Sequence, residues 1–306
     1  MKTANLHKGI YFALTTALIS GFAIFVSKIS VSVLKDPIAF TTIKNTIVAL
    51  FLIGLILSQG KFKKIQKLKF SECWKLIAVG IIGGGIPFAL FFTGLTMTSA
   101  VTAAFIHKTL FIWVAMLAVI FLKERLGTLP FFAILVLLGA NLLLGGSSKF
   151  QFNFGELMIF SSTILWAVET MIAKMALKAV DPDLVATARM TIGSFILFVI
   201  VTWQGNVSLL FSIAPNKIVW LLIPCLFLTG YVLSWYRALK FAPATAVASI
   251  LVLATPITDV LSAIFITKNF SANQFASTSL VILGVILISI LAKKILPLSI
   301  QQLKAA

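Results

Sequence analysis

The sequence predicts an all-α polytopic membrane protein, with ten transmembrane helices arranged as two inverted five-helix repeats. Three observations lead to this fold class: the composition, ten long apolar windows and a similarity between the two halves of the chain. Of the 306 residues, 60% are hydrophobic and only 11% are charged. Water-soluble domains carry about 25% charged residues, so a soluble globular enzyme is excluded.

Each of the ten windows is long enough, or nearly so, to cross a bilayer as a helix. About 20 apolar residues span a hydrocarbon core about 30 Å thick. The windows are continuously apolar and lack the alternation of a membrane β-barrel, so their backbone must be satisfied within helices. In chain order they cover residues 9–34, 37–58, 76–97, 99–122, 129–146, 155–178, 183–203, 218–239, 243–266 and 273–292.

Turn-forming residues separate the windows. They include Asp36-Pro37, Gly60, Gly145-Gly146, Asp181-Pro182, Gly205-Asn206 and Pro243. Proline and glycine in such pairs favour turns and helix starts, so they support the window boundaries.

The basic residues predict the orientation. The net charge is +17, and a soluble protein with this charge would suggest a nucleic-acid partner. Here the charges cluster between the apolar windows, so we expect contact with anionic lipid and no nucleic acid. With the N-terminus inside, 17 Lys and Arg residues fall on the cytoplasmic side and 5 on the other. The positive-inside rule therefore places both termini in the cytoplasm, and we expect the plasma (inner) membrane.

The two halves of the chain resemble each other. Asp36-Pro37 begins a window that continues to Lys44, and Asp181-Pro182 begins one that continues to Arg189 in the same register. Residues 20–29 align with 166–175, and residues 100–104 align with 244–248. Because each half holds five windows, the second half must insert upside down relative to the first. We therefore predict repeats at residues 1–147 and 148–306, which would give two similar conformations open to opposite sides.

These features resemble the drug/metabolite transporter superfamily, specifically its EamA-like ten-helix branch, over residues 9–292. The motifs that carry the resemblance are Thr98–Ala104, Leu122–Leu126, Ala242–Ala248 and Thr255-Pro256. The resemblance implies a secondary transporter that works without ATP and often exports amino acids or other metabolites. The chain departs from the family pattern at Ile112, where proline is usual in the fourth span, and at Lys44, where arginine is frequent.

Six ionisable residues lie deep in the windows, where each costs at least about 2.5–3.5 kcal/mol to insert. They are Lys44, His107, Lys108, Glu169, Arg189 and Asp259. Because three are firmly cationic and two are acidic, pairing within the set leaves one cation over. Such residues are expected to face protein or water and to mark a functional site.

His107 and Lys108 are the sharpest signal, because the fourth window is otherwise apolar. In a functional interpretation Lys108 meets a substrate carboxylate or phosphate, while His107 hydrogen-bonds or carries a proton. In a structural interpretation Lys108 is permanently paired with Asp259 or Glu169.

The other charges also have two interpretations. Glu169 and Asp259 are either proton-coupling carboxylates or fixed partners of Lys174 or Arg189. Lys44 and Arg189 are expected as counter-ions, more readily of the acidic residues that begin the helices than of substrate.

Several uncharged groups are further candidates. Trp166, Trp235 and Tyr236 either line an amphipathic cavity or anchor the protein in lipid. Gly83–Gly85, followed by Pro87, either break the third helix and expose backbone groups or allow close helix packing.

The predicted function is a secondary active transporter that moves an amino acid or other carboxylate-bearing solute, with export favoured and protons as a candidate coupling ion. The alternatives are a carrier of phosphorylated sugars or nucleotide-sugars, a carrier of amines or drugs, and a non-transport membrane protein. A lipid enzyme is disfavoured, because the chain has two histidines and neither HExxH nor GxSxG. No cofactor and no metal are expected.

Overall fold

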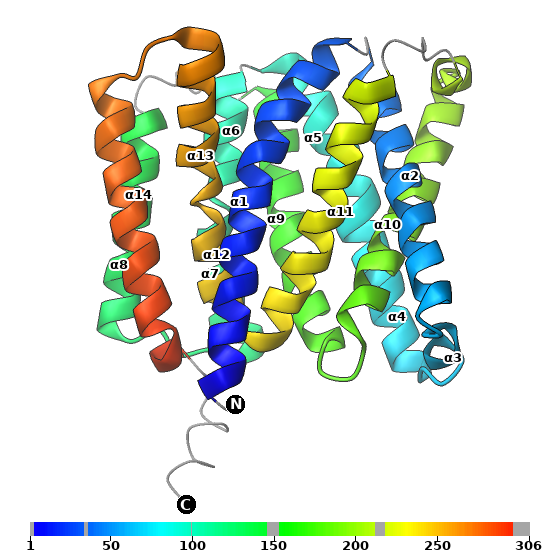
Figure 1. The fold of residues 1–306 in the computed structure, drawn as a ribbon, viewed down its shortest axis with the longest axis horizontal. Helices are drawn as coiled ribbons and strands as arrows, with labels where there is room; N and C mark the ends of the chain where they lie inside the picture. Colours follow the sequence, from blue (N-terminus) through cyan, green and yellow to red (C-terminus); the bar gives the residue numbers. More distant parts are fainter. Residues whose placement is uncertain (1–2, 34–35, 99, 146–152, 212–217, 296–306) are drawn as a thin grey trace, which may run out of the picture.

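The computed structural model describes residues 3–33, 36–98, 100–145, 153–211 and 218–295, and all regular structure in these ranges is helical. The helices run side by side, and the start of α1 and the end of α14 lie at the same end of the bundle (Figure 1). Nine helical stretches in the described ranges are long and apolar enough to cross a membrane. The prediction of an all-α polytopic membrane protein is confirmed at this level.

The principal helices of the first half are α1 (Thr3–Val33), α2 (Pro37–Ser58), α4 (Phe70–Val79), α5 (Ile86–Met97), α6 (Ala100–Lys108), α7 (Leu110–Leu122) and α8 (Thr128–Gly145). Those of the second half are α9 (Phe154–Ala176), α10 (Pro182–Trp203), α11 (Ile218–Phe241), α12 (Ala244–Leu251), α13 (Ala254–Ser262) and α14 (Ala272–Leu291). Short segments join them: α3 (Phe62–Ile65), η1 (Gly80–Gly85), η2 (Val207–Leu210), η4 (Ala263–Thr267) and η5 (Ala292–Ile295). The apolar stretch of α8, Thr128–Leu143, is shorter than the nine others and packs along α14.

Three predicted windows are interrupted helices. The third begins at Phe70 rather than residue 76, and the π-helical segment η1 lies between α4 and α5. The fourth breaks at Thr109, between α6 and α7, and the ninth breaks between α12 and α13. The glycine run had suggested an interruption of the third window, whereas the hydropathy pattern did not reveal the other two.

The two halves begin and end their second helices in the same way. Asp36 and Asp181 are the N-caps of α2 and α10, and their carboxylates accept hydrogen bonds from backbone N–H groups of the first turn. Proline follows each, where its missing N–H and fixed φ suit the first helical position. Gly60 and Gly205 follow the two helices with φ of +63° and +73°, and they are 145 positions apart.

The halves pack against each other along their lengths. The main contacts are between α1 and α11, α8 and α14, α5 and α9, and α2 and α10. Gly84 and Gly193 bring the η1 and α10 backbones together, since a Cβ at Gly193 would meet Gly84 carbonyl atoms at 2.4 Å. Large apolar side chains such as Leu50, Phe195 and Leu226 are exposed on the outer surface, as a bilayer-facing surface requires.

Candidate functional site

A buried chain of polar side chains joins α9, α10 and α11. Tyr236 donates a 2.6 Å hydrogen bond to Oε1 of Glu169, and the Arg189 guanidinium donates to the Tyr236 hydroxyl at 3.4 Å. All three side chains are buried. Glu169 and Arg189 therefore interact through a shared tyrosine, and in the described part of the chain no direct ion pair of the kind expected joins them.

The π-helical segment η1 contributes backbone groups to this site. The indole N–H of Trp166 donates to the carbonyl of Gly83 at 3.0 Å. The side chain of Glu169 lies against the same glycine, so that a Cβ at Gly83 would meet Glu169 Cγ at 2.4 Å. Close packing, one of the two interpretations of the glycine run, is seen at Gly84, whereas the Gly83 carbonyl is engaged by Trp166.

His107 lies in an aromatic cluster next to this chain. Its ring centroid is 4.8 Å from that of Trp166 and 5.3 Å from that of Phe91, and Phe88 also packs on Trp166. Nδ1 of His107 is buried, and no described residue hydrogen-bonds to it. The structure thus brings His107, Trp166 and Glu169 together, while Trp235 stacks on Tyr231 at 6.1 Å on the neighbouring helix α11.

Lys108 interacts electrostatically with Asp259 of α13. Asp259, one of the two partners considered from the sequence, is the acid whose charge acts on Lys108, whereas Glu169 contacts Tyr236.

Lys44 is the deep cation that remains. Its ammonium lies 5.3 Å from the centroid of the Phe40 ring, and within the described ranges no carboxylate lies within ion-pair distance of it. On the same helix, the Thr41 hydroxyl and the Asn45 amide are buried, and neither side chain has a hydrogen-bond partner among described residues. This stretch of α2 therefore presents an ammonium, a hydroxyl and an amide whose binding capacity is unused.

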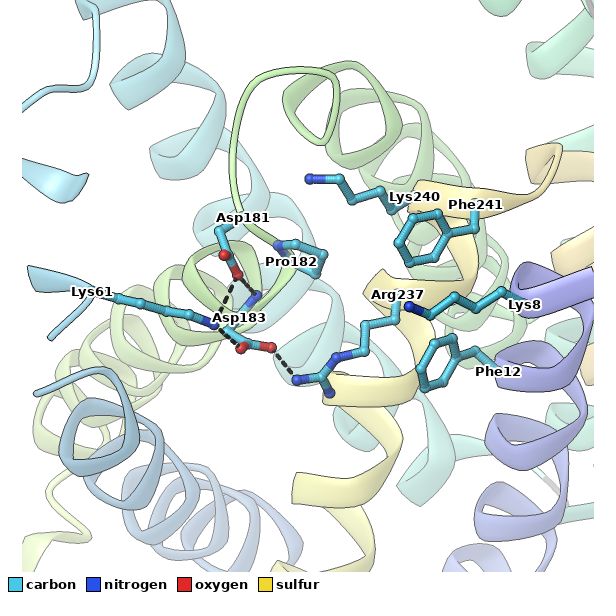
Figure 2. A pocket seen from close by; sticks show the side chains of 9 residues that line it. All are labelled: Lys8, Phe12, Lys61, Asp181, Pro182, Asp183, Arg237, Lys240 and Phe241. Carbon is cyan, nitrogen blue, oxygen red and sulfur yellow. Dashed lines mark hydrogen bonds and ion pairs between the residues drawn. The ribbon is translucent and has the colours of Figure 1, made fainter. Parts of the chain in front are cut away.

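The acidic residues that begin α10 have partners that the sequence interpretation missed. Asp183 accepts from Lys61 at 2.5 Å and from Arg237 at 2.6 Å, and Asp181 pairs with Lys61 at 3.4 Å (Figure 2). Asp181 also pairs with Lys64 at 3.2 Å. The expectation that Arg189 holds these aspartates is wrong. Arg189 lies two helical turns further into the bilayer, about 10 Å along the axis, and reaches Tyr236 instead.

The ion-pair cluster shifts the pKa values of its partly buried members Asp181 and Lys61. Burial opposes ionisation of Asp181, but the Asp183 N–H and the ammonium groups of Lys64 and Lys61 together lower its pKa. Burial likewise opposes the charged form of Lys61, but Asp183 and Asp181 outweigh this and raise its pKa. Both groups are thus held in their charged forms over a wider pH range than usual.

At the opposite end of the α2–α10 pair, an asparagine amide takes the place of the lysine. There Asn206 donates to Asp36 at 3.4 Å, beside a cavity of about 280 Å³. Asp36 is therefore not the partner of Lys44, contrary to the expectation. Since Asn206 is 145 positions after Lys61 and Asp181 is 145 after Asp36, the same contact occurs twice with different chemistry.

Glu124 caps a helix of the other half. Its carboxylate accepts from the backbone N–H groups of Ala244 at 2.6 Å and Thr245 at 3.1 Å, at the start of α12. Burial raises the pKa of Glu124, partly offset by Lys174 and by these hydrogen bonds. Lys174 itself donates to the carbonyls of Leu239 and Ala242, so it is not the partner of Glu169.

The fold and this interior define a polytopic membrane protein with buried charged groups contributed by both halves. The profile of the EamA-like transporter family matches residues 7–146 and again residues 153–290, so the chain belongs to this family. The resemblance seen in the sequence motifs is thereby confirmed.

Known relatives agree on the class. A protein of Archaeoglobus fulgidus named as an uncharacterized transporter is 27% identical over 288 residues, covering 92% of this chain and 98% of that protein. An uncharacterized transporter of Synechocystis is 25% identical over 269 residues, covering 83% and 76%. A solved crystal structure superposes with a TM-score of 0.76 at 15% identity, covering 94% of this chain and 98% of that one, and supports the fold. These names indicate a membrane transporter rather than an enzyme.

Proposed function

We propose that the chain is a secondary active transporter that moves a small carboxylate-bearing solute, such as an amino acid, across the plasma membrane by alternating access. Export is the proposed direction, and both termini lie in the cytoplasm in this proposal. The observation that carries the substrate class is Lys44, a buried cation with no carboxylate partner among the described residues.

The charge balance of the interior supports an anionic substrate. Glu169 and Arg189 both contact Tyr236, and Lys108 interacts electrostatically with Asp259, so each deep acid has a cation in its electrostatic surroundings. The remaining cation is Lys44. A buried charge is costly unless it is paired, and a substrate carboxylate would supply the missing charge.

The groups beside Lys44 suit such a ligand. A carboxylate accepts several hydrogen bonds, and the Thr41 hydroxyl and Asn45 amide each have donors to give. A ligand that binds only in one conformation would satisfy these groups when it is present. We propose His107, Trp166, Trp235 and Tyr236 as the residues that contact the rest of the solute, and Lys108 as a residue that acts with Asp259.

Alternating access is supported by the repeated geometry of the two halves. The four described residues with positive φ form two pairs, Gly60 with Gly205 and Lys123 with Lys268, each separated by 145 positions. The fourth and ninth helices are both broken near their middle. Together with the N-caps Asp36 and Asp181, these features favour an inverted repeat, in which exchange of the two half-conformations opens opposite ends.

Protons are the proposed coupling ion, with Glu169 and Asp259 as the candidate carboxylates. The Glu169 carboxylate accepts directly from the Tyr236 hydroxyl, which is the kind of contact that a protonation step would change. An amine or drug substrate fits this interior less well, because neither deep carboxylate is without a cation.

The test is counterflow in proteoliposomes loaded with a panel of amino acids, organic acids and amines. We expect trans-stimulated uptake of a carboxylate-bearing solute by the wild type, and at least about a tenfold loss in Lys44→Met, because a charged hydrogen bond is worth about 1.5–3 kcal/mol. Lys44→Arg should retain part of the flux. Lys178→Gln, which removes an exposed cation outside the site, is the matched control.

Two results would overturn the proposal. Flux of the carboxylate solute that is unchanged in a folded Lys44→Met protein would remove Lys44 from the site. Counterflow of amines alone would replace the substrate class, and thermal unfolding of each variant shows whether it is folded.

A further inference from the structure

A second cavity lies at the end of the bundle where α10 begins and α11 ends. It has a volume of about 320 Å³ and is separate from the buried polar side chains around Glu169. Lys8 and Phe12 of α1 line one side together with Phe241, and the α10 aspartates line the other (Figure 2). The charge distribution of the chain predicts that this end faces the cytoplasm.

The charges that line this cavity do not balance. Four cations, Lys8, Lys61, Arg237 and Lys240, face two carboxylates, which leaves an excess of two positive charges. Both carboxylates are already engaged, because Lys61 and Arg237 hold Asp183, while Lys61 is also paired with Asp181.

The two cations left over have only neutral partners in the part of the chain that the structure describes. Lys240 donates to the carbonyl of Val180 at 3.3 Å, and the ammonium of Lys8 lies 5.1 Å from the centroid of the Phe241 ring. Each ammonium has three N–H donors, so both retain donors for a further acceptor. Arg237 lies between Lys8 and Asp183 (Figure 2).

We propose that this cavity binds a phosphate monoester. Such a group carries a charge of about −1.5 to −2 at neutral pH and has three acceptor oxygens, which matches the two ammonium groups that have only neutral partners. Lysine binds phosphate as a point charge without a fixed geometry, which suits flexible side chains from two helices. The rings of Phe12 and Phe241 add an apolar wall that would contact the carbon skeleton of the ligand.

The monoester has two possible sources, a soluble metabolite or the headgroup of phosphatidic acid at the membrane surface. The experiment measures thermal unfolding of the purified protein in detergent. Glycerol 3-phosphate is titrated in solution, and phosphatidic acid is titrated in mixed micelles, with phosphatidylglycerol as the matched anionic diester.

The pocket variant is Lys8→Gln with Lys240→Gln, and the control is Lys63→Gln with Lys178→Gln, which removes the same charge from exposed positions. We expect the monoester to raise the unfolding temperature of the wild type and the control. The apparent Kd should weaken at least about tenfold in the pocket variant, because two charge-assisted contacts are lost. Lys8→Gln alone, at an exposed position of α1, gives a second variant with little risk to folding.

Each arm separates one source from the other. A shift with glycerol 3-phosphate assigns the site to a soluble monoester, and a shift with phosphatidic acid but not glycerol 3-phosphate assigns it to lipid. Equal weakening in the pocket and control variants, an equal response to phosphatidylglycerol, or no shift in either arm would overturn the proposal. The assay needs no transport, so its result is independent of the proposed function.

Discussion

At the scale of single residues, Gly83 contributes to the site in two ways, through its backbone carbonyl and through its lack of a side chain. Its carbonyl accepts from Trp166, and its missing side chain leaves the space that Glu169 occupies. Glu169 in turn accepts from Tyr236, which contacts Arg189. One absent methyl group therefore allows the π-helical segment η1, the carboxylate and the indole to lie together.

We predict that Gly83→Ala lowers the free energy of unfolding by about 1–3 kcal/mol, because overpacking a buried contact forces side chains or backbone to move. The Glu169 side chain is the atom group that must shift, since the new Cβ would lie 2.4 Å from its Cγ. Thermal or denaturant unfolding in detergent measures the change. Gly54→Ala is the control, because no atom lies within 4 Å of a Cβ there and alanine favours the helix. Equal stability of the two variants would contradict the assigned packing.

At the scale of elements, the ends of α2 and α10 are held by contacts of different strength. At one end Lys61 bridges Asp181 and Asp183, and at the other Asn206 contacts Asp36. An ion-pair cluster depends on pH, whereas an amide contact to one carboxylate depends on it much less. The two ends should therefore respond differently to titration.

We predict that Lys61→Gln destabilises the protein by an amount that is nearly constant between about pH 5 and 9. The pKa of Asp181 is lowered in the folded state, so its stabilisation is present above the ordinary value of about 3.9 and is lost as the pH falls through the lower folded value. The pKa of Lys61 is raised, so its stabilisation is complete below about 10.4 and is lost as the pH rises through the higher folded value. The unfolding temperatures of wild type and variant should converge at both extremes. For Asn206→Ala, the difference in unfolding temperature from the wild type should not shrink at the alkaline extreme. A difference between the wild type and Lys61→Gln that widens with alkaline pH would refute the ion-pair assignment.

At the scale of the whole molecule, the sequence predicted what depends on composition and local pattern. The second, seventh and eighth helices begin within a residue of the predicted windows, because Asp-Pro caps and long apolar stretches are local signals. The deep charges were also found, because an ionisable group in an apolar stretch is unusual by itself. Among the residues described, nine helices are long and apolar enough to span a membrane and α8 is shorter, so the count of ten spans stays a prediction.

What the sequence did not predict depends on contacts between distant segments. The partners of Asp181 and Asp183 come from α11 and the segment that follows α2, which lie far from them in the sequence. Glu124 caps a helix that begins 120 residues later. Lys44 can be identified as the cation without a carboxylate partner only when the positions of Glu169 and Asp259 are known. These positions depend on how the helices pack.

The difference between the two ends of the α2–α10 pair gives a prediction for the molecule as a transporter. If the halves exchange conformations, one state is closed at the end with the Lys61 ion pairs and the other at the end with the Asn206–Asp36 contact. The ion pairs should stabilise their closed state more than the amide contact stabilises the other. An ion pair of this kind contributes about 1 kcal/mol, which corresponds to roughly a fivefold change in the ratio of two states. Exchanging the two residues, as Lys61→Asn with Asn206→Lys, should therefore move the ratio in the opposite direction without changing the net charge.

Cysteine labelling at the two ends measures this ratio. Thr96→Cys reports on the cavity beside Asp36, and Phe12→Cys reports on the cavity beside Asp183, each in a background without Cys73 and Cys225. We expect the exchange to slow maleimide labelling at position 96 and to speed it at position 12, because the strong contact now closes the opposite end. A change of both rates in the same direction would indicate general loosening, and unchanged rates would show that these contacts do not set the balance between the two states.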